Sequence, residues 1–266
     1  MNRELLDYLC CPICYGNLQL KATKTYEGEI IEGKLFCEFC NRTYNVSNGI
    51  PKLVIRNCFR FSNKLQRALY NIYAPFYDKV ERRSAELLGF REEDLRSTIV
   101  SAMEIDRGNT VLEVCIGTGS NIPYYRKYTN GLIVGTDISE EMLKVCLNKV
   151  KKYKWRRVEL VQGCAEYLPF KSNSFDRVLI GGAISYFSDP KRALEEAGRV
   201  AKPLAKVVIY EQITILEKLL KKDLLPLRLA PKWLTLTDYS YLFKRHFYLT
   251  EFIKQSSFSS KFCYKK

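Results

Sequence analysis

The feature that most constrains this chain is a set of four cysteines near its beginning. Cys11 and Cys14, followed by Cys37 and Cys40, form two Cys-x2-Cys pairs separated by 22 residues. Two such pairs can place four sulfurs in a tetrahedron, the arrangement that zinc accepts in structural sites. Because four protein ligands leave the metal no open position, such a site would hold a fold together without taking part in catalysis. Two disulfides or four buried thiols are the alternatives that the spacing leaves open.

Composition limits the compartment and the class of protein. The 266 residues can bury a large core in one or two domains. No stretch reaches the roughly 18 apolar residues of a membrane-spanning helix. Residues 1–7 lack the basic-then-apolar order of a signal peptide. Ten cysteines without a secretion signal indicate a reducing compartment, so we expect a cytoplasmic protein.

The formal net charge of +14 is unevenly distributed. Residues 1–56 hold seven Lys/Arg and six Asp/Glu, whereas residues 202–266 hold thirteen against five. A further basic cluster contains Lys149, Lys151, Lys152, Lys154, Arg156 and Arg157. Basic surfaces of this kind suit RNA or anionic lipid. A lysine-rich, solvated exterior is the alternative.

Apolar periodicity divides the chain into three parts. Residues 1–56 contain the cysteine pairs, residues 57–107 have helical spacing (Leu65, Leu69, Ile72), and residues 108–266 alternate strands with helices. The predicted strands are residues 111–114, 132–135, 158–162, 177–180 and 206–210, and the predicted helices are residues 79–88, 140–150 and 190–201. This alternation predicts a doubly wound α/β fold, with a parallel sheet covered by helices on both faces, beside a small β-rich ribbon.

A glycine-containing turn follows the first of these strands, in residues 111–121 (VLEVCIGTGSN). Gly117 and Gly119 would let the backbone approach a ligand closely. Asp137 ends the next strand, where an acid can accept both ribose hydroxyls of a nucleoside cofactor. Ile122 stands where a dinucleotide fingerprint needs its third glycine, so the turn is not shaped to hold a pyrophosphate closely. An ATP phosphate loop is excluded because its Gly-Lys-Ser/Thr signature is missing.

These motifs together resemble the class I S-adenosylmethionine-dependent methyltransferases. Residues 113–119 (EVCIGTG) resemble motif I of that family, Asp137 matches its ribose-binding acid, and residues 163–170 (GCAEYLPF) resemble its adenine-bordering segment. The resemblance covers roughly residues 70–212, and the subgroup of ubiquinone and menaquinone methyltransferases opens with a segment like residues 73–78. It implies a Rossmann-like methyltransferase sheet and S-adenosylmethionine as cofactor. The cofactor-binding residues that it implies are Glu113, Gly117, Gly119, Asp137, Ile138, Ala165 and Glu166.

Two cysteines depart from the family pattern. Cys115 replaces the first glycine of motif I, which is tolerable if this residue has ordinary strand dihedrals. Cys164 replaces the acid that accepts a hydrogen bond from the adenine amino group in relatives, and a thiol is a weak acceptor. We therefore expect adenine to rely on backbone contacts around Ala165 and on apolar packing, with somewhat weaker cofactor binding.

The first 56 residues carry a second resemblance. Residues 5–14, 36–44 and 49–53 resemble the zinc-ribbon partner proteins that activate methyltransferases acting on tRNA and on translation factors. Ribosomal-RNA guanine methyltransferases also have an N-terminal ribbon, although their fourth ligand is often His where this chain has Cys40. Both resemblances imply a structural Zn2+ ion bound by the four cysteines.

Direct in-line methyl transfer needs orientation of the reactants and exclusion of water more than a particular catalytic group. No residue stands out as a general base. Tyr124, Tyr125 and Tyr186 follow the turn or the fourth strand and could orient an acceptor, and His246 is the only histidine. Tyr186 and His246 are kept as weak catalytic candidates, with a packing role as the alternative for each.

The sequence does not decide which class of molecule accepts the methyl group. The apolar segment 181–187 favours a small or lipophilic acceptor, and the leucine-rich segment 213–225 suits a lid or a membrane-surface helix, so peripheral membrane contact is possible. The alternative is an RNA methyltransferase, for rRNA or tRNA, that docks through the ribbon and the basic C-terminal third. A non-catalytic zinc-ribbon adaptor is the second alternative. The sequence predicts no oligomeric state.

Overall fold

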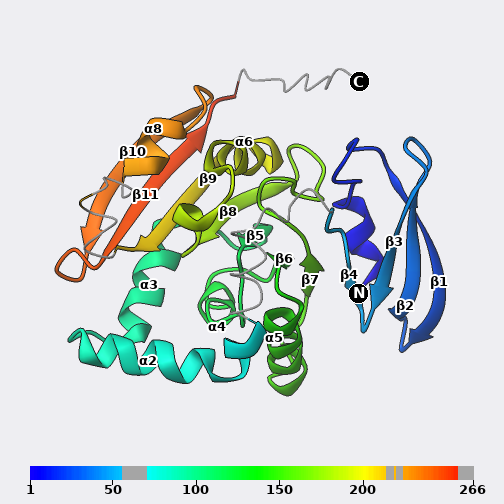
Figure 1. The fold of residues 1–266 in the computed structure, drawn as a ribbon, viewed down its shortest axis with the longest axis horizontal. Helices are drawn as coiled ribbons and strands as arrows, with labels where there is room; N and C mark the ends of the chain where they lie inside the picture. Colours follow the sequence, from blue (N-terminus) through cyan, green and yellow to red (C-terminus); the bar gives the residue numbers. More distant parts are fainter. Residues whose placement is uncertain (56–70, 214–218, 220–223, 257–266) are drawn as a thin grey trace.

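The computed structural model describes residues 1–55, 71–213, 219 and 224–256. Two sheets organise these residues, a four-stranded antiparallel sheet in the first 55 residues and a seven-stranded mixed sheet after them (Figure 1). Leu65, Leu69 and most of the predicted helix at residues 213–225 lie outside the described residues. Among the described helices, none combines the length and the apolar character needed to cross a membrane.

The small sheet is a meander in the order β1-β2-β3-β4, and it forms the ribbon. Its elements are η1 (Arg3–Asp7), β1 (Leu18–Tyr26), β2 (Glu29–Cys37), β3 (Arg42–Ser47) and β4 (Ile50–Pro51). Two of its hairpins turn through consecutive residues with positive φ, Glu27 with Gly28 and Asn48 with Gly49. Such turns match the right-handed twist of paired strands, which explains how the chain can reverse so tightly there.

The large sheet has the order β10-β11-β9-β8-β5-β6-β7. Its strands are β5 (Val111–Val114), β6 (Ile133–Asp137), β7 (Val158–Gln162), β8 (Phe175–Gly181), β9 (Ala201–Gln212), β10 (Leu234–Leu242) and β11 (Phe247–Lys254). Strands β5 to β9 are parallel, which confirms the predicted parallel sheet with helices on both faces. The hairpin β10–β11 was not predicted, and it adds two antiparallel strands beside β9.

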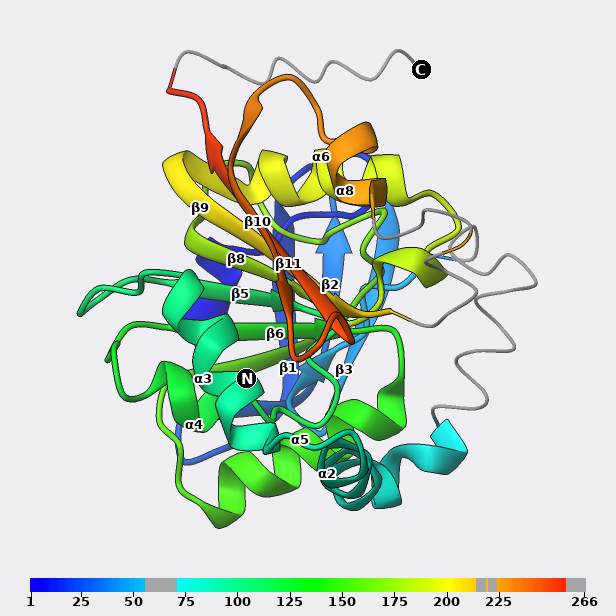
Figure 2. The same cartoon turned by 90° about the vertical axis from the view of Figure 1, so that its left-hand side faces the viewer.

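Helices cover both faces of this sheet. They are η3 (Ala74–Phe76), α2 (Tyr77–Leu87), α3 (Glu92–Ala102), α4 (Ile122–Tyr125), α5 (Glu140–Lys152), η4 (Ile184–Tyr186), α6 (Pro190–Val200) and α8 (Leu225–Leu229). Figure 2 shows α6 and α8 on one side of the sheet and α4 and α5 on the other. The three predicted helices correspond to α2, α5 and α6, with bounds that differ by two residues at most.

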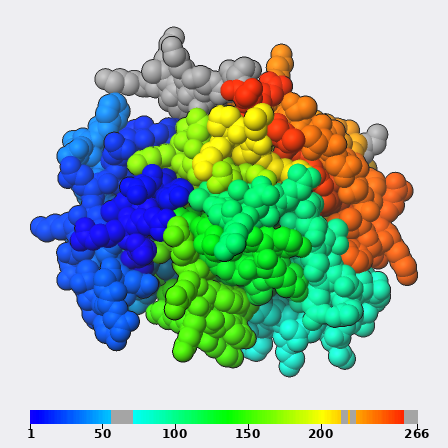
Figure 3. Space-filling model, turned by 180° about the vertical axis from the view of Figure 1, so that it is seen from behind, coloured from blue at the N-terminus to red at the C-terminus, as the bar shows by residue number. Residues whose placement is uncertain are grey.

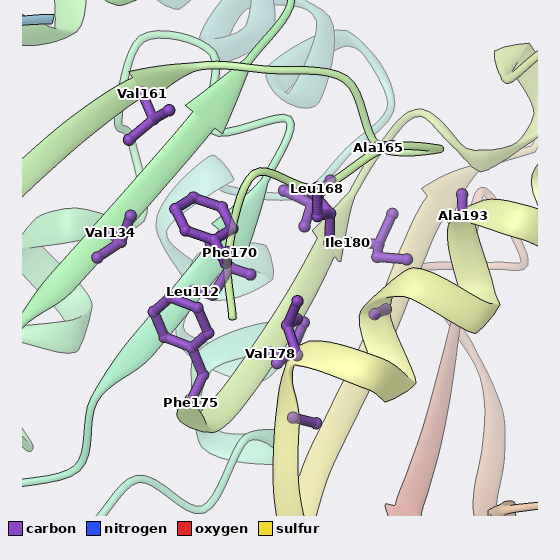
Figure 4. Packing of buried hydrophobic residues seen from close by; sticks show 14 of the residues in the cluster. Leu112, Val134, Val161, Ala165, Leu168, Phe170, Phe175, Val178, Ile180 and Ala193 are labelled. Atoms are coloured by element: carbon purple, nitrogen blue, oxygen red, sulfur yellow. The ribbon is translucent and has the colours of Figure 1, made fainter. Parts of the chain in front are cut away.

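Side chains that alternate along each strand belong to two separate buried clusters, one on each face of the sheet. Leu112, Val134 and Val178 pack with α6, whereas their chain neighbours Val111 and Ile133 pack with α3 and α5. Successive side chains of a strand point to opposite faces, so each strand of the parallel sheet must be apolar on both sides. In the core on the α6 face, the rings of Phe170 and Phe175 meet edge to face at 5.3 Å (Figure 4). Phe170 lies in the segment after β7, and Phe175 is the first residue of β8.

The ribbon completes the core on the α6 face. Leu5, Leu9 and Leu53 of the first 55 residues belong to the same buried cluster as Phe170 and Phe175. Figure 3 shows the blue N-terminal part lying directly against the green region of the chain. The ribbon therefore covers apolar surface next to β7, which would otherwise be an open edge of the sheet.

A buried ion pair joins the ribbon to the larger sheet. Arg199 bonds Glu196 on the same helix and donates to the carbonyls of Phe170 and Leu168, at 2.7 and 3.0 Å. From the ribbon, the Tyr15 hydroxyl donates to Glu196 at 3.0 Å. The two charges are compensated within this network, as burial requires.

Candidate active site

A cavity of about 110 Å³ lies where the carboxyl ends of β5, β6, β7 and β8 meet. Its walls come from the turn after β5, the ends of β6 and β7, the segment after β8, and one side chain of α2, Tyr77. The crevice beyond the carboxyl ends of parallel strands is where open α/β sheets bind their ligands. The fold therefore gathers segments between Tyr77 and Phe187, far apart in the sequence, into one pocket.

The turn after β5 has three residues with left-handed backbone. The φ angles of Cys115, Gly117 and Gly119 are 63°, 55° and 78°. Cys115 therefore does not have the ordinary strand dihedrals that would make it tolerable in place of glycine. Its left-handed backbone conformation costs about 1 kcal/mol or more. A β-carbon at Gly119 would stand 2.6 Å from the Cys146 sulfur, so Gly119 permits close packing on α5. Gly117 lines the cavity, and Gly119 is not among the lining residues.

Asp137 at the end of β6 is bound to this turn. Its carboxylate accepts backbone N–H groups from Gly117 at 2.9 Å and from Ser139 at 2.8 Å. Burial nevertheless raises its pKa, against the lowering effect of these donors. Asp137 and Ile138, two of the residues that the family resemblance implies as cofactor-binding, both line the cavity. Each carboxylate oxygen retains capacity for a second donor, such as a ribose hydroxyl.

Glu113 lies beneath the turn and does not line the cavity. Its carboxylate accepts hydrogen bonds from the Asn121 amide at 2.6 Å and from the Tyr125 hydroxyl at 2.9 Å. Burial raises the pKa of Glu113 to about 7, even though these two bonds and Arg96 favour the ionised form. The structure thus places this acid as a support for the turn, one layer below the pocket.

The segment after β7 brings Cys164, Ala165 and Glu166 to the cavity wall. The Cys164 thiol donates to the Glu166 carboxylate at 2.7 Å, and the Ser188 backbone N–H donates to the same group at 3.0 Å. Cys164 is therefore engaged as a donor within the protein. Its weakness as an acceptor for adenine stays a prediction.

The charges in the cavity wall are all negative. Among the described residues, Asp137 and Glu166 are the carboxylates that line the cavity, and no Lys, Arg or His lines it. The Thr136 hydroxyl, which also lines it, is buried without a hydrogen-bond partner. A β-carbon added at Gly117 would meet no atom within 4 Å. The cavity thus suits a ligand that brings hydroxyl or amino donors and a positive charge, and it disfavours a phosphate.

Aromatic side chains form the rest of the wall. Tyr77 comes from α2, and Tyr186 and Phe187 come from the segment after β8. Of the two weak catalytic candidates, only Tyr186 lines the cavity, and His246 lies in the turn between β10 and β11. Tyr125 is buried against Glu113, and Tyr124 lies on α4 outside the lining.

Sequence reasoning missed a polar junction that holds α2 against the turn. The Asp78 carboxylate accepts hydrogen bonds from the hydroxyls of Thr118 at 2.5 Å and Ser120 at 3.1 Å, and it pairs with Lys149 of α5. These partners lower the pKa of Asp78 although burial raises it. The available signal was the position of Asp78 at the end of residues 73–78, a segment that we matched to the family without assigning it a role.

The four cysteines of the ribbon meet at one point. Their sulfurs all lie within 4.8 Å of one another, with Cys11 to Cys40 at 3.5 Å and Cys14 to Cys37 at 3.4 Å. A tetrahedron of sulfurs about 2.3 Å from a zinc ion has edges of about 3.8 Å. The four thiols are free, and these separations far exceed the roughly 2.05 Å of a disulfide bond, so the disulfide alternative is wrong. The donor set fits a closed metal site.

Two family models each match one part of the chain. Residues 112–209 match the methyltransferase domain, and residues 2–49 match Trm112p-like proteins. Among curated relatives, demethylmenaquinone methyltransferase of Oceanobacillus iheyensis is 33% identical over 152 residues, which are 56% of this chain and 63% of that protein. The enzyme of the same name from Bacillus cereus is 31% identical over 148 residues, 55% of this chain and 62% of that protein. The chain thus spans less than two thirds of the length of these relatives.

Solved structures support the same fold. A SAM-dependent methyltransferase from Aquifex aeolicus superposes with a TM-score of 0.53 at 22% identity, over 60% of this chain and 89% of that one. A chain from the complex between the Haloferax volcanii Trm112 methyltransferase activator and a methyltransferase gives 0.55 at 16% identity, over 70% of this chain and 97% of that one. The large sheet therefore has the Rossmann-like methyltransferase fold.

Proposed function

We propose that this chain, which joins a methyltransferase domain to a Trm112p-like domain, transfers a methyl group from S-adenosylmethionine to a small, lipophilic acceptor. The observation that carries the cofactor assignment is the charge of the cavity. In the part of the chain that the structure describes, its wall contains two carboxylates and no cationic side chain. A sulfonium cofactor is stabilised in such a field, whereas the pyrophosphate of a dinucleotide would be repelled.

Three residues of the cavity wall have the chemistry that S-adenosylmethionine would need. Asp137 would accept the ribose hydroxyls, Gly117 would allow close approach of the backbone, and Ala165 would border the adenine. Glu113 would support the turn from below. When bound, this cofactor supplies a methyl group on a positively charged sulfur, which a nucleophile in line with the carbon–sulfur bond can accept.

The protein's own contribution is orientation and exclusion of water. Tyr77, Tyr186 and Phe187 would hold a flat, apolar acceptor against the cofactor, and the tyrosine hydroxyls could orient an oxygen of the acceptor. The curated relatives are demethylmenaquinone methyltransferases, which supports a quinone-like acceptor here. The aromatic wall agrees with that chemistry.

We assign a structural zinc ion to the four cysteines of the ribbon, and a cytoplasmic location to the protein. All four ligands come from the protein, so the ion would stabilise the ribbon without meeting substrate. The free thiols of the site require a reducing environment.

The test is methyl transfer from radiolabelled S-adenosylmethionine in host extract, followed by partition into organic, RNA and protein fractions. We expect label in the organic fraction, and no label with the Asp137→Ala protein. Label in the RNA fraction alone would replace the lipophilic acceptor with a nucleic acid. Failure to bind S-adenosylhomocysteine would overturn the enzymatic assignment and favour the adaptor.

One observation favours RNA as the second candidate acceptor. Tyr153 and Trp155 stack at 5.2 Å within the basic cluster before β7, which gives a cationic surface with exposed aromatic area. This surface lies at the amino end of β7, however, and the cavity lies at its carboxyl end. It could dock a polyanion but would not itself present a base to the cavity.

A further inference from the structure

The outer side of the helical segment before and within α2 carries large apolar side chains. Ile72, Phe76 and Leu87 are 76%, 63% and 81% exposed, and Val80 is 39% exposed. Residues 71–87 are helical throughout, with a 3-10 turn at η3. Folding leaves all four of these side chains, hereafter the outer stripe, in contact with solvent.

The spacing of Phe76, Val80 and Leu87 puts these three members of the outer stripe on one side of α2. They are separated by four and seven residues, which on a helix of about 100° per residue fall within an arc of about 40°, whereas Ile72 precedes the 3-10 turn η3. The inner side faces the protein, because Ala74 and Ala85 are buried there. This is an amphipathic helix whose second apolar surface has no partner among the described residues.

The charges beside the outer stripe are mainly positive. Lys79 and Arg83 are exposed beside it on α2, against one exposed carboxylate, Glu86, which lies 3.7 Å from Arg83, and exposed Arg82 lies further around the helix. The other two acids of the helix do not share this surface. Asp78 bonds the turn after β5, and half-buried Glu81 has a raised pKa because of its burial.

The outer stripe is also adjacent to the cavity. Tyr77, which follows Phe76 in the chain, lines the cavity from the inner side of the same helix. Figure 1 shows α2 at the rim of the molecule, away from the ribbon, and just after the end of α2 the ring of Phe90 stacks on Phe243 in the turn of the β10–β11 hairpin at 4.6 Å. A surface that binds α2 would therefore lie next to the wall through which an acceptor meets the cofactor.

We propose that the outer stripe docks on the surface of an anionic lipid bilayer, so that a lipophilic acceptor passes from the bilayer into the cavity past Tyr77. Aliphatic side chains enter the acyl boundary while flanking Lys and Arg contact the headgroups, the arrangement of interfacial amphipathic helices. RNA would offer the aliphatic side chains no apolar partner. The inference rests on the proposed lipophilic acceptor.

The test is co-sedimentation of the full chain with vesicles of phosphatidylcholine alone or with added phosphatidylglycerol. We expect binding that increases with the anionic lipid. Phe76→Ser combined with Leu87→Ser should weaken it about tenfold or more. Tyr26→Ser, at a 66% exposed aromatic residue of the ribbon, is the matched control and should leave it unchanged. Lys79→Glu should reduce binding only to the anionic vesicles.

Two measurements separate this inference from the proposed function. S-adenosylhomocysteine binding, and methyl transfer to a quinol without its isoprenoid tail, should be unchanged in the Phe76/Leu87 double variant. Wild-type protein that methylates such a soluble acceptor but ignores vesicles would overturn the bilayer inference alone. Loss of self-association in the double variant, without any vesicle binding by the wild type, would assign the stripe to a second copy of the chain instead. Protein that binds no cofactor would overturn the proposed function itself.

Discussion

The backbone N–H of Leu53 in the ribbon donates to the carbonyl of Gln162, the last residue of β7, at 2.8 Å. Residues 163–170 follow β7, and at their far end Leu9 of the ribbon forms an antiparallel β-bridge with Phe170. The ribbon therefore holds both ends of residues 163–170, the segment that lines the cavity from the β7 side. These contacts join the ribbon, which carries the four-cysteine cluster, to the pocket wall through the backbone.

Metal removal should weaken cofactor binding through that connection. Treatment with a chelator, or Cys14→Ser, should lower the melting temperature and reduce the affinity for S-adenosylhomocysteine, because the ribbon can no longer hold residues 163–170. Calorimetric titration and thermal unfolding measure the two effects. Zn2+ added back to the chelated wild type should restore both, and an unchanged affinity in metal-free protein would contradict the coupling.

Asp137→Asn should lower the affinity for S-adenosylhomocysteine by about ten- to a hundredfold. Hydrogen bonds to a charged acceptor contribute about 1.5–3 kcal/mol, and the amide keeps only part of that acceptor capacity. The same change at Asp106, whose carboxylate is exposed and remote from the cavity, should have no effect. Equal affinities for the two variants in calorimetry would remove Asp137 from the site.

Glu113 should make stability pH-dependent. Burial raises its pKa to about 7 in the folded protein, from the ordinary value of 4.5, so the folded state favours the protonated form. The resulting stabilisation is complete below pH 4.5 and is lost as the pH rises through 7, an effect of about 3 kcal/mol.

Glu113→Gln isolates this effect, since glutamine stays neutral and its amide can reach Asn121, whose Oδ1 is buried without a partner. The wild type should lose stability relative to the variant between pH 5 and pH 8 in urea unfolding. Parallel stability profiles would show that Glu113 titrates normally.

Cys115→Gly should stabilise the protein by about 0.5–1 kcal/mol. The φ angle of 63° strains a residue with a β-carbon, whereas glycine adopts it freely at some cost in unfolded-state entropy. Denaturant titration measures the change, with Cys146→Gly as a control that should destabilise because Cys146 is buried within α5. A destabilised Cys115→Gly protein would indicate that the thiol makes a contact worth more than the strain.

The buried ion pair of α6 should be far more sensitive than an exposed one. Arg199→Met leaves the Glu196 carboxylate buried without its partner, which should cost about 3–5 kcal/mol of unfolding free energy. Arg83→Met removes an exposed pair with Glu86 and should cost less than about 1 kcal/mol. Similar losses in the two variants would mean that the Arg199 network contributes no more than a surface pair.

The sequence alone determined the features that depend on neighbouring residues. Strands β5 to β9 follow from short apolar runs between turns, and the place of Asp137 at a strand end follows from the same pattern. The cysteine pairs predict their own cluster because each Cys-x2-Cys is a local turn. The hairpin β10–β11 also had a local signal, since residues 234–242 alternate apolar and polar side chains in part, but we did not use it.

The tertiary structure alone decided the relationships between distant segments. Three such relationships depend on which surfaces meet when the chain folds. The ribbon contacts β7, Asp78 accepts a hydrogen bond from Thr118, and Glu113 accepts one from Asn121 below the pocket. Periodicity shows that a face is apolar but does not specify its partner, because burial of apolar area is non-directional. The direction comes from hydrogen bonds and shape, which exist only after the segments are in contact.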